Sequence, residues 1–138
     1  MPDSLTAHLV VPIADDEDAR ATAETLGAYE FGTVTAVHVV EKGGGTPDKI
    51  PLEQAEQRAD EALGAFRDVL PDAETELTYD TDIVDGVFDV AADVSASAIA
   101  FRPRGGSRIA QFISGDTALT LVTESDRPVI ALPEQPDE

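Results

Sequence analysis

The chain has 138 residues, 28 of them acidic and nine of them lysine or arginine, and its formal net charge is −19. This length is common for one globular domain, and the charge disfavours nucleic-acid binding, which needs a basic surface. The absence of cysteine excludes disulfides and thiolate metal sites, and no apolar run approaches the ~20 residues of a membrane span. We therefore expect a cytoplasmic protein whose excess carboxylates suit a halophilic cell, because salt screens their repulsion.

Short apolar runs predict strands, and segments with helical spacing lie between them. The predicted strands are residues 7–13, 33–41, 74–80, 97–101 and 128–132. The predicted helices are residues 14–30, 51–70, 82–95 and 116–125. Asp15 or Asp16 is the expected N-cap of the first helix. Residues 42–51, "KGGGTPDKIP", form a loop, and the alternating pattern of 74–80 predicts an edge strand with one wet face.

The alternation of strands and helices decides the fold class. It requires parallel strands, right-handed crossovers and helices on both faces of the sheet. We therefore predict an α/β fold, a Rossmann-like open parallel sheet in a single domain over residues 1–133, with a loose acidic tail at 134–138. Ligands of such sheets bind beyond the carboxyl ends of the strands, where the winding direction switches. Residues 12–18, "PIADDED", and 102–117, "RPRGGSRIAQFISGDT", lie at that edge.

Nearly the whole chain resembles a known family. "HLVVPI" (8–13), "VHVVE" (37–41) and above all the block "RGGSRIAQFISGDTALTLVTESDRPVIAL" (104–132) are similar to the universal stress protein (UspA-like) family. The acidity points to a haloarchaeal type of member. The resemblance implies an adenine nucleotide alpha hydrolase-like fold with five parallel strands in the order 3-2-1-4-5. Family membership argues the fold strongly and the function weakly.

The family's nucleotide motif is only half present. Nucleotide-binding members resemble G-x-x-G, nine residues, then G-[ST], where glycines and a helix N-terminus hold the phosphates. Gly105 and Gly115 match with nine residues between them, but Arg102 replaces the first glycine and Asp116 follows the last. The family's aspartate after the first strand falls on Ala14. The resemblance thus implies a degenerate nucleotide site. Its family-equivalent ligand-binding residues are Pro12, Ile13, Ala14, Val40, Arg102, Arg104, Gly105, Ser107, Gly115, Asp116 and Thr117.

Asp116 is the departure with the largest expected effect. A carboxylate at a helix N-terminus takes the favourable dipole position of a phosphate and repels an incoming one. We predict that Arg102 reaches toward Asp116 and that this pair replaces the missing anion internally. Two other interpretations stay open for Arg102, Arg104 and Arg108. They form a positively charged binding site for another small anion, or they pair with carboxylates from elsewhere on the surface.

No residue pattern predicts catalysis or a metal site. The carboxylates of "DDED" (residues 15–18) are better explained by helix capping and exposure to solvent than by binding of a divalent cation. His8 and His38 lie in strand patterns without a clustered partner. The chain has no G-x-S-x-G elbow and no P-loop. We expect no enzymatic activity, no metal and no cofactor, the alternative being ATP with Mg.

The last predicted strand, "PVIAL", is uniformly apolar, and the resemblance implies that it lies at the edge of the sheet. An exposed apolar edge is a template for association. We therefore predict a homodimer through Pro128, Val129, Ile130, Ala131 and Leu132. The expected function is a regulatory or interaction module with a degenerate nucleotide site. The alternative is a universal stress protein that binds ATP or another nucleotide through the Gly105–Gly115 loop, with Ser107 and Thr117.

Overall fold

The computed structural model describes residues 4–41, 52–102 and 115–133, with the backbone alone at Glu41, Leu52 and 115–118. One five-stranded sheet has the order β3-β2-β1-β4-β5, and all neighbouring strands are parallel. The strands are β1 (His8–Pro12), β2 (Thr33–Glu41), β3 (Glu74–Asp80), β4 (Ala98–Phe101) and β5 (Val129–Ala131). The helices are α1 (Asp16–Leu26), α2 (Leu52–Val69), α3 (Ile83–Asp93) and α4 (Gly115–Glu124). The predicted fold class and strand order are confirmed.

The predicted loop at 42–51 and the predicted tail at 134–138 lie outside the described residues. None of the described helices is both long enough and apolar enough to cross a membrane.

The first helix is shorter at both ends than its sequence pattern predicts. Asp15 is the N-cap, and its side chain accepts a hydrogen bond from the backbone N–H of Asp18, which fixes the start of α1. The helix ends at Leu26, where Gly27 is the C-cap. Asp82 caps α3 in the same way, accepting from two first-turn backbone N–H groups. These caps place the first turns of α1 and α3 at the carboxyl edge of the sheet.

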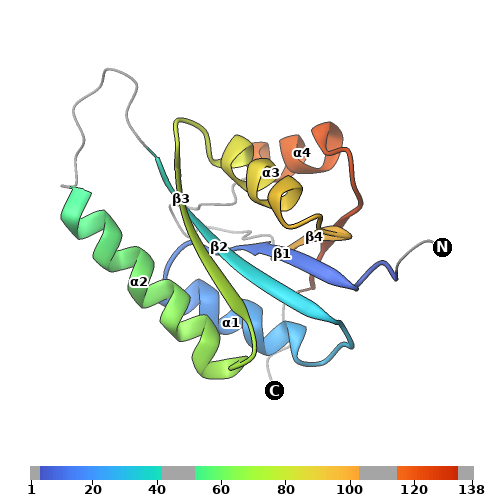
Figure 1. Ribbon diagram of the computed structural model, residues 1–138, viewed down its shortest axis with the longest axis horizontal. Coiled ribbons are helices and arrows are strands. Elements are labelled where there is room, and N and C mark those ends of the chain that lie inside the picture. The colour runs from blue at the N-terminus through green and yellow to red at the C-terminus, as the bar shows by residue number, and fades with distance from the viewer. Residues whose placement is uncertain (1–3, 42–51, 103–114, 134–138) are drawn as a thin grey trace.

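Each face of the sheet carries its own apolar core. Figure 1 shows α1 and α2 on one face and α3 and α4 on the other. Leu9 of β1 belongs to the first core together with Leu26 and Phe66, whereas the neighbouring Val10 belongs to the second, with Val87. Because adjacent side chains of β1 enter opposite cores, this strand is buried on both faces. The strand order makes β1 and β4 neighbours at the point where the chain changes face.

The amino end of β1 is fastened by several hydrogen bonds. The backbone N–H of His8 donates to Ser97 Oγ at 2.9 Å, and the N–H of Ser97 donates to the His8 carbonyl at 2.8 Å. Ser97 Oγ also lies 2.8 Å from the Leu5 carbonyl, to which it donates. His8 Nε2 lies 2.9 Å from Thr35 Oγ1 on β2. This end of the strand is therefore joined by hydrogen bonds to segments from three parts of the chain.

Arg127 joins the end of α3 to the start of β5. Its Nη1 donates to the carbonyl of Ala91 at 2.9 Å and to that of Ala96 at 3.1 Å. The last turn of α3 has no basic residue of its own. The end of α3 has its own Schellman-type cap, because Ser95 has a φ of 55° and the N–H groups of Ser95 and Ala96 donate to the carbonyls of Ala92 and Ala91. Arg127 adds a cation to this cap, which complements the helix dipole.

Candidate functional site

The structure brings the described family-equivalent residues to the carboxyl edge of the central strands. Pro12 ends β1, and Ile13 and Ala14 follow it directly. The N–H of Ile13 donates to the Val37 carbonyl at 3.0 Å, which holds the end of β1 against β2. Val40 is buried near the end of β2. Arg102 follows β4, so Ala14 and Arg102 lie at the ends of neighbouring strands.

The remaining family-equivalent residues are not placed in full. Arg104, Gly105 and Ser107 lie outside the described residues, as does Arg108. Gly115, Asp116 and Thr117 form the first turn of α4, where the structure describes the backbone alone.

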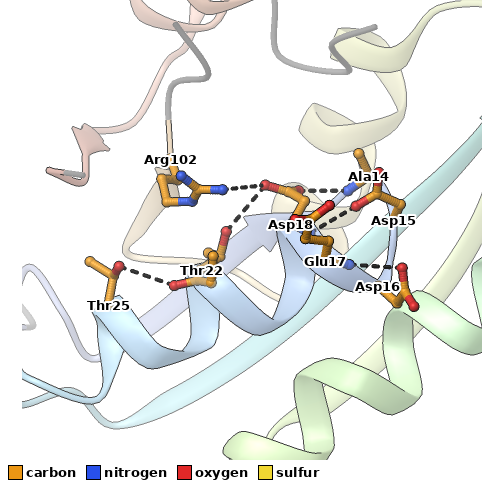
Figure 2. A network of polar contacts seen from close by, with 9 residues as sticks. Ala14, Asp15, Asp16, Glu17, Asp18, Thr22, Thr25 and Arg102 are labelled. Carbon is orange, nitrogen blue, oxygen red and sulfur yellow. Dashed lines mark hydrogen bonds and ion pairs between the residues drawn. The ribbon is translucent and has the colours of Figure 1, made fainter. Parts of the chain in front are cut away.

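Asp18, in the first turn of α1, is the centre of a polar network at this edge (Figure 2). It is only 4% exposed. Its Oδ2 accepts a hydrogen bond from the backbone N–H of Ala14 at 2.8 Å. Its Oδ1 lies 3.4 Å from Arg102 Nη2 and 3.5 Å from Thr22 Oγ1, both of which donate to it. We call these four residues, Ala14, Asp18, Thr22 and Arg102, the switch-point site, because β1 and β4 meet there.

Arg102 crosses from the end of β4 to α1, and Figure 2 shows its guanidinium directed at Asp18. Its side chain is 14% exposed, and its ion pair with Asp18 has a distance of 3.4 Å. Its Nε is buried and has no hydrogen-bond partner among the described residues. Unpartnered buried donors are uncommon and costly. Arg102 therefore holds more hydrogen-bonding capacity than its single carboxylate contact uses.

The predicted pair of Arg102 with Asp116 lies outside what the structure describes, because only the backbone of Asp116 is described. Among the described residues, the carboxylate that Arg102 contacts is Asp18. This contact has a topological reason. Because β1 and β4 are neighbours, the first turn of α1 reaches the end of β4, and a carboxylate on that turn meets Arg102.

The chain matches the model of a known family of proteins. The model is described as "Universal stress protein family" and matches residues 6–133. The chain belongs to the universal stress protein family. None of the curated proteins matches the chain, so the other similarities come from solved structures.

Solved universal stress proteins share the fold of this family member. One from Archaeoglobus fulgidus is 23% identical, with a TM-score of 0.62, over 91% of this chain and 93% of that one. The Archaeoglobus fulgidus universal stress protein in complex with dAMP is 21% identical, with a TM-score of 0.61, over 94% and 99%. A universal stress protein in complex with cAMP is 16% identical, with a TM-score of 0.60, over 96% and 100%. At these identities the likeness concerns the fold.

Sequence reasoning missed Asp18 and Thr22 as parts of the site of this universal stress protein. Asp18, Thr22 and Leu26 follow one another at intervals of four residues and are all buried. That spacing puts them on the inward stripe of α1. A carboxylate on an inward stripe requires a partner, because an unpaired buried charge is costly. This was the signal that could have separated Asp18 from its acidic neighbours.

The other acids of "DDED" have local roles. Asp15 caps α1, and Asp16 Oδ1 accepts from the N–H of Glu17 at 2.8 Å. Among the described residues, no three side chains of histidine, aspartate or glutamate are grouped so that they could hold a metal ion. Asp15 and Asp16 therefore have local roles at the start of α1.

His38, on β2, is a second buried polar group near this edge. It is 8% exposed, and its Nδ1 lies 3.1 Å from the Ile13 carbonyl, to which an Nδ1–H donates. Burial lowers the pKa of His38 below its ordinary value, and the charge of Arg58 lowers it further. The hydrogen bond to Ile13 and the charge of Asp15 act in the opposite direction. The His38 ring therefore holds Ile13 in place. Ile13 is the residue that joins β1 to Ala14 of the switch-point site.

The predicted dimer strand is less exposed than its position at the sheet edge implied. Val129 packs against the core under α3 and α4, and Ile130 packs against the core under α1 and α2. Leu132 is buried, whereas Pro128 and Ala131 are exposed. The apolar character of this segment therefore has an internal cause as well. Beside β5, on the α1 face, lies a groove of about 300 Å³ with mostly apolar walls that include Leu26, Phe31 and Ile130.

Proposed function

We propose that this chain is a non-catalytic regulatory or interaction module whose nucleotide site is degenerate and does not bind ATP in the usual way of the family. The observation that carries the proposal is the contact between Asp18 and Arg102 across the ends of β1 and β4. Two groups of the chain itself meet where ligands of open parallel sheets bind.

The carboxylate of Asp18 opposes an anionic ligand at this edge. The backbone N–H of Ala14, a donor that could serve a phosphate, already serves the carboxylate of Asp18. Two like charges at about 4 Å repel by about 4 kcal/mol at an effective dielectric constant of about 20. Arg102 also adds a side chain where the family motif has a glycine. These features support a site that the chain occupies for itself.

A second function is nucleotide binding through Gly105, Ser107, Gly115 and Thr117, with Mg as the companion of ATP. It is favoured by the similar universal stress proteins that were solved in complex with dAMP and with cAMP. The start of α4 at Gly115 agrees with it, because a helix N-terminus favours an anion. A third proposal is a small anion at Arg102, Arg104 and Arg108.

The surroundings of the protein follow from its charge. A net charge of −19 without cysteine favours a reducing, salt-rich cytoplasm, in which ions screen the repulsion between surface carboxylates. We therefore assign the chain to the acidic, halophilic type of universal stress protein. The measurements proposed for it are accordingly made in molar KCl.

Calorimetric titration of the purified protein with Mg-ATP, ADP and AMP in molar KCl tests the proposal. We expect no heat of binding with any of the three. Micromolar binding by the wild type would establish the nucleotide function and refute the degenerate site. The matched variant is the double substitution Arg102→Gly, Asp116→Ser, which restores both motif positions. Binding by this variant alone would show that those two residues abolish the site.

For the partner, we propose a homodimer through residues 128–132. The N–H of Leu132 donates to Phe101 on β4, so the alternation of a strand turns the N–H of Ala131 outward. An outward row of backbone groups on β5 can accept a second strand. Ala131→Pro removes an outward donor and leaves the bonds to β4 in place. Sedimentation in molar KCl should show a dimer for the wild type and a monomer for this variant; a monomeric wild type would refute the dimer.

A further inference from the structure

The acceptor oxygens of Asp18 mark out a small oxyanion site. Among the described residues, three donors converge on its carboxylate: the Ala14 N–H at 2.8 Å, Arg102 Nη2 at 3.4 Å and Thr22 Oγ1 at 3.5 Å. A backbone amide, a guanidinium and a hydroxyl are the groups that bind carboxylates and phosphates in proteins. They come from the segments that follow β1 and β4 and from α1, and Figure 2 shows them around one carboxylate.

We propose that Ala14, Thr22 and Arg102 form a latent oxyanion site, occupied in the native protein by the carboxylate of Asp18 as an internal ligand. The proposal rests on the proposed function in that it explains how the chain fills its own site. The ligand class it assigns is a small carboxylate or phosphate monoanion. Of the family-equivalent nucleotide positions, Ala14 and Arg102 take part in it, whereas Gly105 and Gly115 do not.

The geometry favours an internal ligand that can be replaced. The Oδ1–Nη2 distance of 3.4 Å is longer than the ~2.8 Å of a good charge-assisted hydrogen bond. The Nε of Arg102 is buried and has no partner in the part of the chain that the structure describes. An anion not tethered to α1 can move closer to the guanidinium than the Asp18 side chain does. In the wild type, however, the tethered carboxylate has a high effective concentration and excludes it.

Removal of the Asp18 side chain should therefore create a binding site for a free anion. The test variant is Asp18→Gly, and the probe is formate, which replaces chloride stepwise at constant ionic strength. Above its Kd, formate should raise Tm in proportion to the logarithm of its concentration, by about 5 °C at roughly ten times Kd. Wild-type protein should show no such rise. Inorganic phosphate, as a second probe, distinguishes a site for any oxyanion from one that fits a carboxylate alone.

Three variants separate a site from a general salt effect. Asp16→Gly makes the same substitution at an exposed acid of the same turn and should not respond to formate beyond the wild type. Asp18→Asn removes the charge but fills the space, and it should not respond either. Asp18→Gly with Arg102→Gln should lose the response. A response of Asp16→Gly equal to that of Asp18→Gly, or one that survives the loss of Arg102, would overturn the proposal.

The test remains decisive if Asp18→Gly does not fold in chloride. The yield of refolded protein is then compared in formate and chloride at equal ionic strength. It is measured by near-ultraviolet circular dichroism of tyrosine and phenylalanine, because the chain has no tryptophan. Recovery in formate alone supports the site, and equal failure in both salts refutes it. Nucleotide titration of the wild type decides the proposed function independently. If the wild type binds ATP and formate still rescues Asp18→Gly, only the degenerate nucleotide site is refuted. If the wild type does not bind ATP and formate does not rescue Asp18→Gly, only the oxyanion site is refuted.

Discussion

The two ends of β1 are closed by different chemistry. At the amino end, Ser97 and Thr35 satisfy His8 with hydrogen bonds of 2.8 to 2.9 Å. At the carboxyl end, Asp18 and Arg102 form an ion pair at 3.4 Å, and a guanidinium nitrogen lacks a partner among the described residues. Hydrogen bonds of ordinary length hold segments together. The ion pair, which is longer, lies where open parallel sheets bind ligands.

The largest effect is expected at the amino end, from Gly32→Ala. A Cβ at Gly32 would collide with the backbone carbonyl of Ala7, which itself accepts a hydrogen bond from the N–H of Thr33. Because backbone must move, the free energy of unfolding should fall by about 3 kcal/mol, at the upper end of overpacking costs. Denaturant unfolding in molar KCl measures it.

Gly64→Ala is the matched control, because a Cβ there meets no atom within 4 Å. It lies in α2 and should raise the free energy of unfolding by about 0.5 to 1 kcal/mol, since alanine favours a helix. If Gly32→Ala costs no more than this control gains, the amino end is not the rigid end of the strand.

Arg102→Met should have the next largest effect, at the carboxyl end. It leaves Asp18 buried without its guanidinium, and we expect a loss of about 2 kcal/mol of unfolding free energy, below the range for fully buried pairs because Arg102 is partly exposed. In a double-mutant cycle with Asp18→Asn, the loss in the double variant should be about 1 kcal/mol smaller than the sum of the losses in the two single variants. Combined with Ser97→Ala at the opposite end, Arg102→Met should be additive. Full additivity in the first cycle would mean that the ion pair contributes nothing.

The smallest effect is a pH dependence that arises at His38. Because burial puts its pKa in the folded protein below 6.5, the unfolded chain binds more protons between the two pKa values. The free energy of unfolding therefore falls as the pH is lowered from 6.5 through the folded pKa, and His38 adds no such loss above 6.5. His38→Gln keeps a donor for Ile13 and should flatten this part of the curve. Thermal unfolding of both proteins across that range measures the difference, with His8→Gln as the control for loss of a histidine. Parallel curves for the wild type and His38→Gln would contradict the assignment.

The fold could be predicted because its signals are local and repeated. Apolar β-branched runs alternate with helical spacing, and this order permits few topologies. Helix ends were harder, since Gly27 ends α1 within a segment whose composition still favours a helix. For the candidate site, the sequence predicted the carboxyl edge of the sheet but not the contact between Arg102 and Asp18. Arg102 was singled out from the motif, but its partner comes from α1, 84 residues away in sequence, and spacing along one loop cannot reveal such a contact.

Arg127 bears on how the chain acquires this structure. Its guanidinium reaches the carbonyls of Ala91 and Ala96, which lie 36 and 31 residues earlier in the sequence. These contacts therefore form only after segments far apart in the sequence have come together. Contacts of long sequence separation delay folding, so we expect the end of α3 and β5 to gain protection from amide hydrogen exchange together, late in refolding.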